Sequence, residues 1–368
     1  MKEWAKAHEL NSFNSMKGLS YYEHYKKTLA WLDNKGTLPP PIECNLDPYA
    51  ECNARCYFCI GQRYLRTHRE EVGEMRKLPE EYMYKLVDFI SYWGVKGLCV
   101  SGGGDASLYQ PVYRVLPYAK SKGMDVSFVT NGWYLPDELA ESMMVCRWIC
   151  FSVNAGNGEA QKAVMGRNKF STVKANITKV IKLRTKTNSK VDVAYRMLIL
   201  PENQHTIAEA CRAAKELGVQ DFNVRPADFE RNDIIGHHKL ELNLNLIQEE
   251  FEKCHEMETD DFHVYTVVHK FSDDLHVKHD FKRCYATLIM PVLQDGNIYL
   301  CNDKKMESKY RIGSAMPPES ILSWWGSEYH KQMMKNIDVD AECSRCTMGA
   351  YFKQIEAIVS DSMCLNFP

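Results

Sequence analysis

Short apolar runs and amphipathic stretches alternate along the chain between residues 78 and 228. Apolar runs bounded by turn residues predict buried strands at 95–100, 124–132, 147–156, 190–200 and 219–228. Between them, residues 78–94, 111–123, 135–146, 170–187 and 205–218 have apolar positions at helical spacing. A further strand at 40–46 gives six strands separated by helices, the pattern of parallel βα units.

Six βα units are too few for a closed eight-unit barrel. We therefore expect an α/β fold, with an open, partial (β/α)6 barrel of parallel strands over residues 41–235. In such folds the chemistry lies at the carboxyl ends of the strands.

The alternation stops near residue 230. Residues 240–257 predict a linking helix, 262–271 and 285–301 predict strands, and 327–337 predict a short polar helix. The Asp295-Gly296 step is typical of a hairpin turn. We therefore expect a helical extension over 1–40, a linker over 236–280 and a small α+β domain over 281–368.

Composition is that of a soluble globular enzyme, with 368 residues, 45% hydrophobic and 26% charged positions. The formal net charge of −2 gives no reason to expect bulk binding to nucleic acid or to an anionic membrane. There is no run of 18 apolar residues, and the polar first residues do not form a signal peptide. These features favour a cytoplasmic protein without a membrane span.

The chain has 14 cysteines, and in the cytoplasm clustered cysteines more often bind metal or do redox chemistry than form disulfides. Three lie close together at Cys52, Cys56 and Cys59. A second set lies in the last quarter of the chain: Cys284, Cys301, Cys343, Cys346 and Cys364. The remaining six are interpreted as small core residues: Cys44, Cys99, Cys146, Cys150, Cys211 and Cys254.

Three close cysteines leave a tetrahedral zinc site one ligand short. In a cubane [4Fe-4S] cluster, three thiolates would bind three irons and leave the fourth iron open. The spacing C-x3-C-x2-C places the three thiols on one compact loop, with the aromatic ring of Phe58 beside them. A zinc site completed by a distant ligand is the alternative.

The segment CNARCYFC resembles the cysteine signature of radical S-adenosylmethionine (SAM) enzymes, and the resemblance extends over about residues 40–230. It implies that SAM binds the open iron, and that one electron cleaves it to methionine and a 5′-deoxyadenosyl radical. That radical removes a hydrogen atom from the substrate. An electron donor such as flavodoxin or ferredoxin is implied as a partner.

Further motifs resemble the SAM-binding motifs of the same family. Gly102, Gly103, Gly104 and Asp105 correspond to the loop that meets the SAM amino group, although the family usually has Glu-Pro where this chain has Asp105-Ala106. Ser152 and Asn154 correspond to the ribose-contacting strand, with Asn154 in the place of an acid, and Arg196 is a candidate for the SAM carboxylate. The alternatives are an ordinary tight turn for the glycines and plain strand positions for Ser152, Asn154 and Arg196.

The C-terminal cysteines resemble a twitch domain, the half-length form of the SPASM domain. This resemblance implies that Cys284, Cys301, Cys343 and Cys346 hold one auxiliary [4Fe-4S] cluster, with Cys364 as a spare. A zinc site that holds a small domain together is the alternative.

The expected reaction is hydrogen abstraction from a small polar metabolite such as a sugar, aminocyclitol or nucleoside. The outcome is oxidation or a redox-neutral rearrangement or epimerisation. Arg225, Asp228 and Glu230, at the end of the sixth strand, are candidates for binding that substrate. A peptide- or nucleobase-modifying radical SAM enzyme and a non-catalytic zinc protein are the alternative functions.

Overall fold

The computed structural model describes residues 15–67, 74–227, 241–267, 279–343 and 346–360. Within them the strands form one sheet of ten, in the order β10-β9-β8-β1-β2-β3-β4-β5-β6-β7. Their bounds are β1 Glu43–Leu46, β2 Gly97–Val100, β3 Asp125–Thr130, β4 Trp148–Ser152, β5 Asp192–Ile199, β6 Asp221–Pro226, β7 His263–Thr266, β8 Ile289–Val292, β9 Asn297–Tyr299 and β10 Arg311–Ser314.

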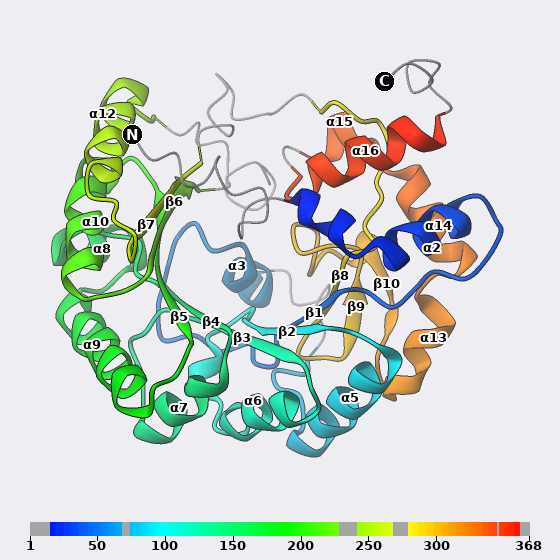
Figure 1. Cartoon of the computed structure of the whole chain (residues 1–368), viewed down its shortest axis with the longest axis horizontal. Helices are drawn as coiled ribbons and strands as arrows, with labels where there is room; N and C mark the ends of the chain where they lie inside the picture. The colour runs from blue at the N-terminus through cyan, green and yellow to red at the C-terminus, as the bar shows by residue number, and fades with distance from the viewer. Residues whose placement is uncertain (1–14, 68–73, 228–240, 268–278, 344–345, 361–368) are drawn as a thin grey trace.

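The sheet curves into an open ring with most of the helices outside it, while α3 is seen within the ring in this view (Figure 1). The helices are α2 Tyr22–Leu32, α3 Ile60–Thr67, α5 Glu80–Trp93, α6 Pro111–Ser121, α7 Asp137–Ser142, α8 Gly158–Met165, α9 Phe170–Thr187, α10 Ile207–Glu216, α12 Leu244–His255, α13 Ile321–Trp324, α14 Glu328–Asn336, α15 Val339–Glu342 and α16 Gly349–Val359. Short 3-10 turns lie at η1 Ser15–Ser20, η2 Ala106–Leu108, η3 Met143–Val145, η4 Gln204–Thr206, η5 Ser308–Tyr310 and η6 Pro318–Ser320.

The α/β partial barrel expected from the sequence is confirmed, and the sheet extends beyond its six predicted strands at both edges. Strands β1 to β7 pair in parallel, so the 236–280 range adds β7 to β6. On the other edge β8 pairs with β1, also in parallel. The linker and the C-terminal range therefore each contribute strands to the same sheet.

Successive side chains of a strand point to opposite faces of the sheet, and those on the outer face are more buried than those on the inner face. In β5 the side chains of Val193, Tyr195 and Met197 are fully buried against the helices. Arg196 and Leu198, which point to the other side, stay partly exposed. The inner face is therefore the side on which polar side chains can meet a bound molecule.

The helix predicted over residues 78–94 ends where the sequence indicates. Helix α5 stops at Gly94, whose φ of 110° is accessible to glycine at little cost, and its N–H bonds back to Ile90. The predicted Asp295-Gly296 turn is confirmed, because Gly296 has a φ of 75° and joins the antiparallel strands β8 and β9.

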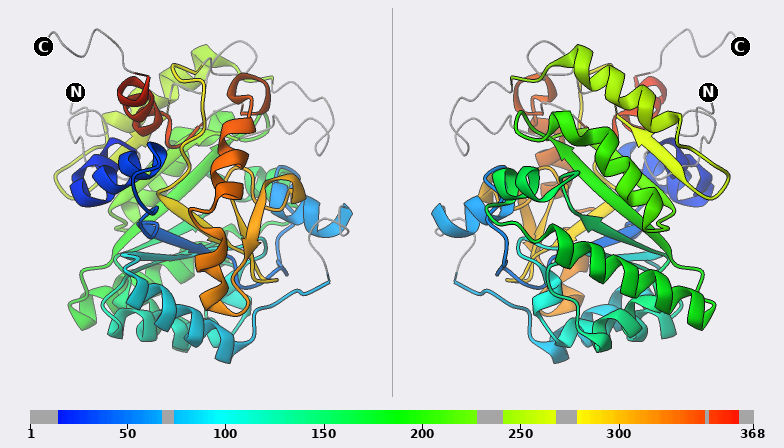
Figure 2. Two further views of the ribbon diagram at one scale, coloured as in Figure 1. Left: turned by 90° about the vertical axis from the view of Figure 1, so that its right-hand side faces the viewer. Right: turned by 90° about the vertical axis from the view of Figure 1, so that its left-hand side faces the viewer.

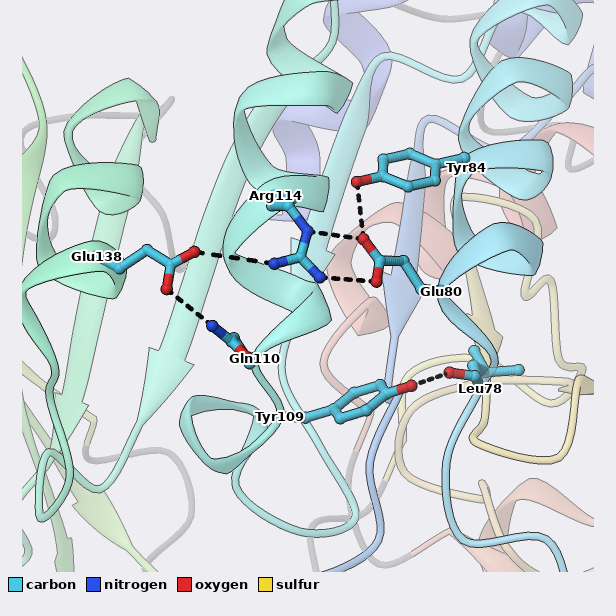
Figure 3. A network of polar contacts seen from close by, with 7 residues as sticks. All are labelled: Leu78, Glu80, Tyr84, Tyr109, Gln110, Arg114 and Glu138. Carbon is cyan, nitrogen blue, oxygen red and sulfur yellow. Dashed lines mark hydrogen bonds and ion pairs between the residues drawn. The ribbon is translucent and has the colours of Figure 1, made fainter.

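Neighbouring outer helices are joined by a polar network on the surface (Figure 3). Arg114 of α6 donates two hydrogen bonds of 2.7 Å to the carboxylate of Glu80 at the start of α5. Its guanidinium also lies 3.8 Å from a carboxylate oxygen of Glu138 in α7, which accepts a hydrogen bond from Gln110. The network fixes the spacing of three consecutive helices.

The N-terminal segment packs on the C-terminal region rather than on the barrel helices (Figure 2). The indole of Trp31 in α2 donates to the carbonyl of Gly326, and Lys331 of α14 lies over the same ring. In the part of the chain that the structure describes, no helix has the length and apolarity needed to cross a bilayer.

Candidate functional site

The three N-terminal cysteines lie on a loop that leaves the carboxyl end of β1 and leads into α3. This loop is held on both sides by backbone hydrogen bonds. On one side Leu78 bonds to Pro48, and on the other the amide of Gly104 bonds to Tyr49 and that of Asp105 to Glu51. The cysteine loop and the glycine loop after β2 are therefore fixed to each other, at the sheet edge where the sequence predicts the chemistry.

Backbone amides point at two of the three thiols. The Ala54 amide donates to Sγ of Cys52, and the Gln62 amide donates to Sγ of Cys59, each at 3.4 Å. Such donors favour the thiolate form that binds iron. That the three cysteines together hold a cluster stays a prediction.

The three thiols are close enough to influence one another electrostatically. Burial raises the pKa of Cys52 to about 12, and the nearby charge of Asp105 adds to this increase. Burial also raises the pKa of Cys56 well above its usual value, and Cys59 and Cys52 raise it further. Because cationic metal centres favour the thiolate, three partly buried thiols held near one another fit the ligand set of such a centre.

The predicted glycine loop has no room for side chains. A methyl group on Gly104 would lie 2.1 Å from the carbonyl oxygen of Glu51, and one on Gly103 would lie 2.4 Å from the side chain of Met306. Gln62 of α3 then fastens the loop, since its side-chain amide donates to the carbonyls of Gly103 at 2.7 Å and Ala50 at 2.9 Å. Gln62 is a site residue that the sequence analysis missed.

Asp105 is buried, and its carboxylate accepts hydrogen bonds from its own loop and from the loop after β3. It accepts hydrogen bonds from the amide of Ser107, the hydroxyl of Thr130 and the amide of Asn131. The predicted acid therefore ties the glycine loop to the loop after β3. In this structure it holds backbone in place, and its role toward SAM stays a prediction.

Ser152 and Arg196 lie side by side on the inner face of adjacent strands. Ser152 pairs with Arg196, Arg196 pairs with Asn223 of β6, and Asn223 pairs with Tyr265 of β7. This row of polar side chains crosses four strands, from the last residue of β4 to the middle of β5 and β6 and on to β7. The sequence predicted its first two members, while Asn223 and Tyr265 gave no separate signal.

Asn154 and Phe58 are both buried in the protein. The side chain of Asn154 accepts a hydrogen bond from the Leu198 amide, and its backbone has a φ of 58°. Phe58 belongs to the main hydrophobic core, with its ring at 5.8 Å from that of Tyr57. Their predicted roles beside SAM remain predictions.

Of the three residues predicted to bind substrate, Arg225 is described and lies on the inner face of β6, paired with Leu198. Asp228 and Glu230 lie outside the described residues.

An ion pair with one fully buried and one partly exposed partner joins the C-terminal region to the residue that follows β1. Lys305, from the segment after β9, lies 2.7 Å from the carboxylate of Asp47, which is fully buried at the end of β1. The other carboxylate oxygen accepts a hydrogen bond from Ser101 at 2.8 Å. Nothing in the spacing of these residues along the chain could have indicated the pair.

The four C-terminal cysteines predicted to act together are neighbours in space. Burial raises the pKa of Cys284 well above its usual value, and Cys301 and Cys343 raise it further. The pKa of Cys346 is likewise raised by burial, then by Cys284 and by other nearby acidic groups that include Cys301. Cys364 lies outside the described residues. Among the described residues, no three His, Cys, Asp or Glu side chains are gathered closely enough to hold a single metal ion.

A family model described as the Radical SAM superfamily matches residues 47–214, from the end of β1 to α10. This part of the chain is therefore similar to the radical SAM superfamily. The match begins just before the cysteine loop and includes the glycine loop, Ser152 and Arg196.

Solved radical SAM structures share this fold. SuiB of Streptococcus suis bound to S-adenosylmethionine aligns with 92% of this chain and 78% of its own, at 13% identity and a TM-score of 0.64. SuiB bound to precursor peptide SuiA aligns with 92% of this chain and 77% of its own, at 14% identity and a TM-score of 0.64. The anSMEcpe enzyme with bound AdoMet and a Cp18Cys peptide covers 85% of this chain and 88% of its own, at 15% identity and a TM-score of 0.57. No curated protein sequence matches this chain significantly.

Proposed function

We propose that this protein is a radical SAM enzyme that abstracts a hydrogen atom from a small polar substrate. The observation that carries the proposal is the attachment of the cysteine loop to the glycine loop, through the backbone of Tyr49 and Glu51 and the side chain of Gln62. In this arrangement Cys52, Cys56 and Cys59 would hold a [4Fe-4S] cluster. The bound cluster and SAM would supply an electron and a 5′-deoxyadenosyl radical.

The protein's own residues bind and orient the reactants. The glycine loop presents backbone carbonyls and amides without side chains, which suits close contact with the amino group of SAM. Ser152 and Arg196 offer a hydroxyl and a cation on the inner face, where a ribose and a carboxylate would find partners. A reactive carbon radical also needs a site from which water is excluded.

The polar inner face supports a substrate that carries hydroxyl or charged groups. Asn223, Arg225 and Tyr265 lie there on the neighbouring strands β6 and β7. A sugar, aminocyclitol or nucleoside has the hydrogen-bonding groups to match such a surface. Oxidation or a redox-neutral rearrangement or epimerisation follows from the same first step.

We further propose that Cys284, Cys301, Cys343 and Cys346 hold one auxiliary [4Fe-4S] cluster. Their mutual electrostatic influence supports this grouping. An auxiliary cluster of this kind could accept an electron from a substrate radical, which would make the overall reaction an oxidation. A zinc ion at the same cysteines is the alternative.

A peptide is the second candidate substrate. Two structures with the same fold are bound to peptides, SuiB to the precursor peptide SuiA and anSMEcpe to a Cp18Cys peptide. Incubation of the reduced enzyme with either class of substrate labelled with deuterium separates the two. The true substrate transfers its label to 5′-deoxyadenosine.

The test of the proposal is SAM cleavage by anaerobically reconstituted protein. The wild type should be brown and should release 5′-deoxyadenosine from SAM once it is reduced. Alanine at Cys52, Cys56 or Cys59 should abolish this release, because each change removes one cluster ligand. Cys211→Ala, in α10, is the matched control and should retain it. A colourless wild type that binds stoichiometric zinc and never releases 5′-deoxyadenosine would refute the proposal.

A further inference from the structure

The loop after β3 places an asparagine side chain against a cluster ligand. Asn131 is 7% exposed, and its side-chain nitrogen lies 3.8 Å from Sγ of Cys52 and 2.7 Å from the side-chain oxygen of Asn53. An N–H donor can reach a sulfur acceptor at such a distance, because sulfur is larger than oxygen. The contact joins a residue of the β3 loop to a thiol on the β1 loop.

The hydrogen-bond network fixes which end of the Asn131 amide faces the sulfur. The side-chain oxygen accepts the backbone N–H of Trp133 at 2.8 Å. That leaves the nitrogen, with its two N–H groups, to face Asn53 and Cys52. A reversed amide would place an oxygen beside the thiolate and would lose the bonds to Trp133 and Asn53.

The loop that carries Asn131 is itself held firmly. Its backbone N–H donates to the buried carboxylate of Asp105 at 2.7 Å, and the adjoining Thr130 hydroxyl donates to the same group. On the far side, Asn176 of α9 donates to the carbonyl of Gly132 at 2.7 Å. A side chain held at both ends of its loop keeps its distance to the sulfur when the cluster changes its charge.

A hydrogen bond to a cluster sulfur changes the energy of adding an electron. Reduction makes the cluster and its thiolates more negative, so a nearby N–H donor stabilises the reduced form more than the oxidised form. In a buried place the effect is larger than in water, because less solvent screens it.

We propose that Asn131 is a positioning residue that raises the reduction potential of the SAM-binding cluster through its hydrogen bond to Cys52. The proposal rests on the proposed function, since it requires a cluster on Cys52, Cys56 and Cys59. It assigns an electronic role to the Thr130-Asn131-Gly132 loop, in addition to its structural one.

The test is an anaerobic redox titration of the reconstituted full-length protein, monitored by electron paramagnetic resonance. The cluster in question is the one whose signal changes when SAM is added. Asn131→Leu removes the donor, and its midpoint potential should shift to a more negative value than that of the wild type. Asn131→Asp keeps the shape and the oxygen that accepts the Trp133 N–H, but turns an oxygen toward the sulfur, so its shift should be larger still.

Asn176→Ala is the matched control, because it disturbs the same loop without touching the sulfur. Its midpoint potential should equal that of the wild type. Unchanged potentials in both Asn131 variants, or an equal shift in Asn176→Ala, would overturn the proposal. Loss of iron from both Asn131 variants while Asn176→Ala keeps its iron would overturn it as well, because the role would then be structural. A wild type without any SAM-responsive signal would instead refute the proposed function.

Discussion

At the scale of single residues, the candidate site is built by side chains that bind the backbone of a neighbouring loop. The Gln62 side chain donates to the carbonyls of Ala50 and Gly103. The Asp105 carboxylate accepts hydrogen bonds from the backbone amides of Ser107 and Asn131. These contacts connect the loops after β1, β2 and β3. The three loops should therefore respond as a unit to the loss of any one contact.

Replacing Gly104 by alanine should disrupt the site. The new methyl group would lie 2.1 Å from the carbonyl oxygen of Glu51 and 2.6 Å from the carbonyl carbon of Ala50, and neither backbone atom can move freely. We expect a loss of about 1–3 kcal/mol in the free energy of unfolding and weaker SAM binding, measured by denaturant titration and calorimetry. Gly36→Ala is the control, because a methyl group there meets nothing within 4 Å. Equal SAM affinity in the two variants would contradict this account.

The spacing of residues along the sequence predicted part of the site, but not the hydrogen bonds that connect its loops. The three cysteines and the glycine run have fixed separations on single loops, so the sequence alone indicated them. Gln62 and Asn131 are amides in short segments, and their importance depends on which loop lies opposite. The Thr-Asn-Gly sequence after β3 was the available signal, because it stands at the carboxyl end of a predicted strand.

At the scale of elements, the outer helices are linked by charged side chains at their amino ends. The carboxylate of Glu80 is held between Arg114 and Tyr84, as Figure 3 shows. The two hydrogen bonds from Arg114 lower the pKa of Glu80 below its usual value. The groups lie near the surface, so the effect on stability should be small.

The stability of the Glu80–Arg114 pair should depend on pH. A carboxyl whose pKa is lower in the folded than in the unfolded chain stabilises the fold above its unfolded pKa, and this contribution is lost as the pH falls through its folded pKa. The melting temperature of Arg114→Met should therefore lie below that of the wild type at pH 7, with the difference shrinking below about pH 4. Glu80→Gln and the double variant complete a cycle that isolates the pair. A constant difference at every pH would rule out this role.

The alternation of strands and helices was predictable, whereas the pairing of the C-terminal strands was not. Each βα unit has its own hydrophobic period, which a single sequence reveals. The Asp295-Gly296 turn indicated that β8 pairs with β9. The residues of β8 gave no indication that its other edge pairs with β1. The short helix α3 also escaped prediction, because it has only eight residues and contains Gly61, a poor helix former.

At the scale of the whole molecule, the two cysteine sets lie in different parts of the chain, so their contributions should be separable. If both hold [4Fe-4S] clusters, the wild type should contain about eight irons per chain. Serine at Cys343 and Cys346 should reduce this to about four and should leave SAM cleavage partly intact, while turnover falls. Iron analysis and product assays measure the two effects. Full turnover in this variant would refute an electronic role for the C-terminal cysteines.

The Lys305–Asp47 pair should contribute to the attachment of the C-terminal region to the barrel. Lys305→Met would leave the fully buried carboxylate of Asp47 without its cation, and removal of one member of a buried pair costs roughly 3 kcal/mol. Denaturant unfolding should show this loss. The double variant Asp47→Asn, Lys305→Met should recover part of it, because no charge is then left unpaired. If the double variant is less stable than Lys305→Met alone, the explanation fails.

The parallel pairing of β8 with β1 also bears on the order in which the protein assembles. Strand β1 is among the first to leave the ribosome, yet the partner on one of its edges is among the last. Until that partner arrives, β1 exposes unpaired backbone groups that can recruit other chains. A fragment that stops after β7 should consequently aggregate during expression. In the longer chain β8 pairs with the exposed edge of β1 and prevents this.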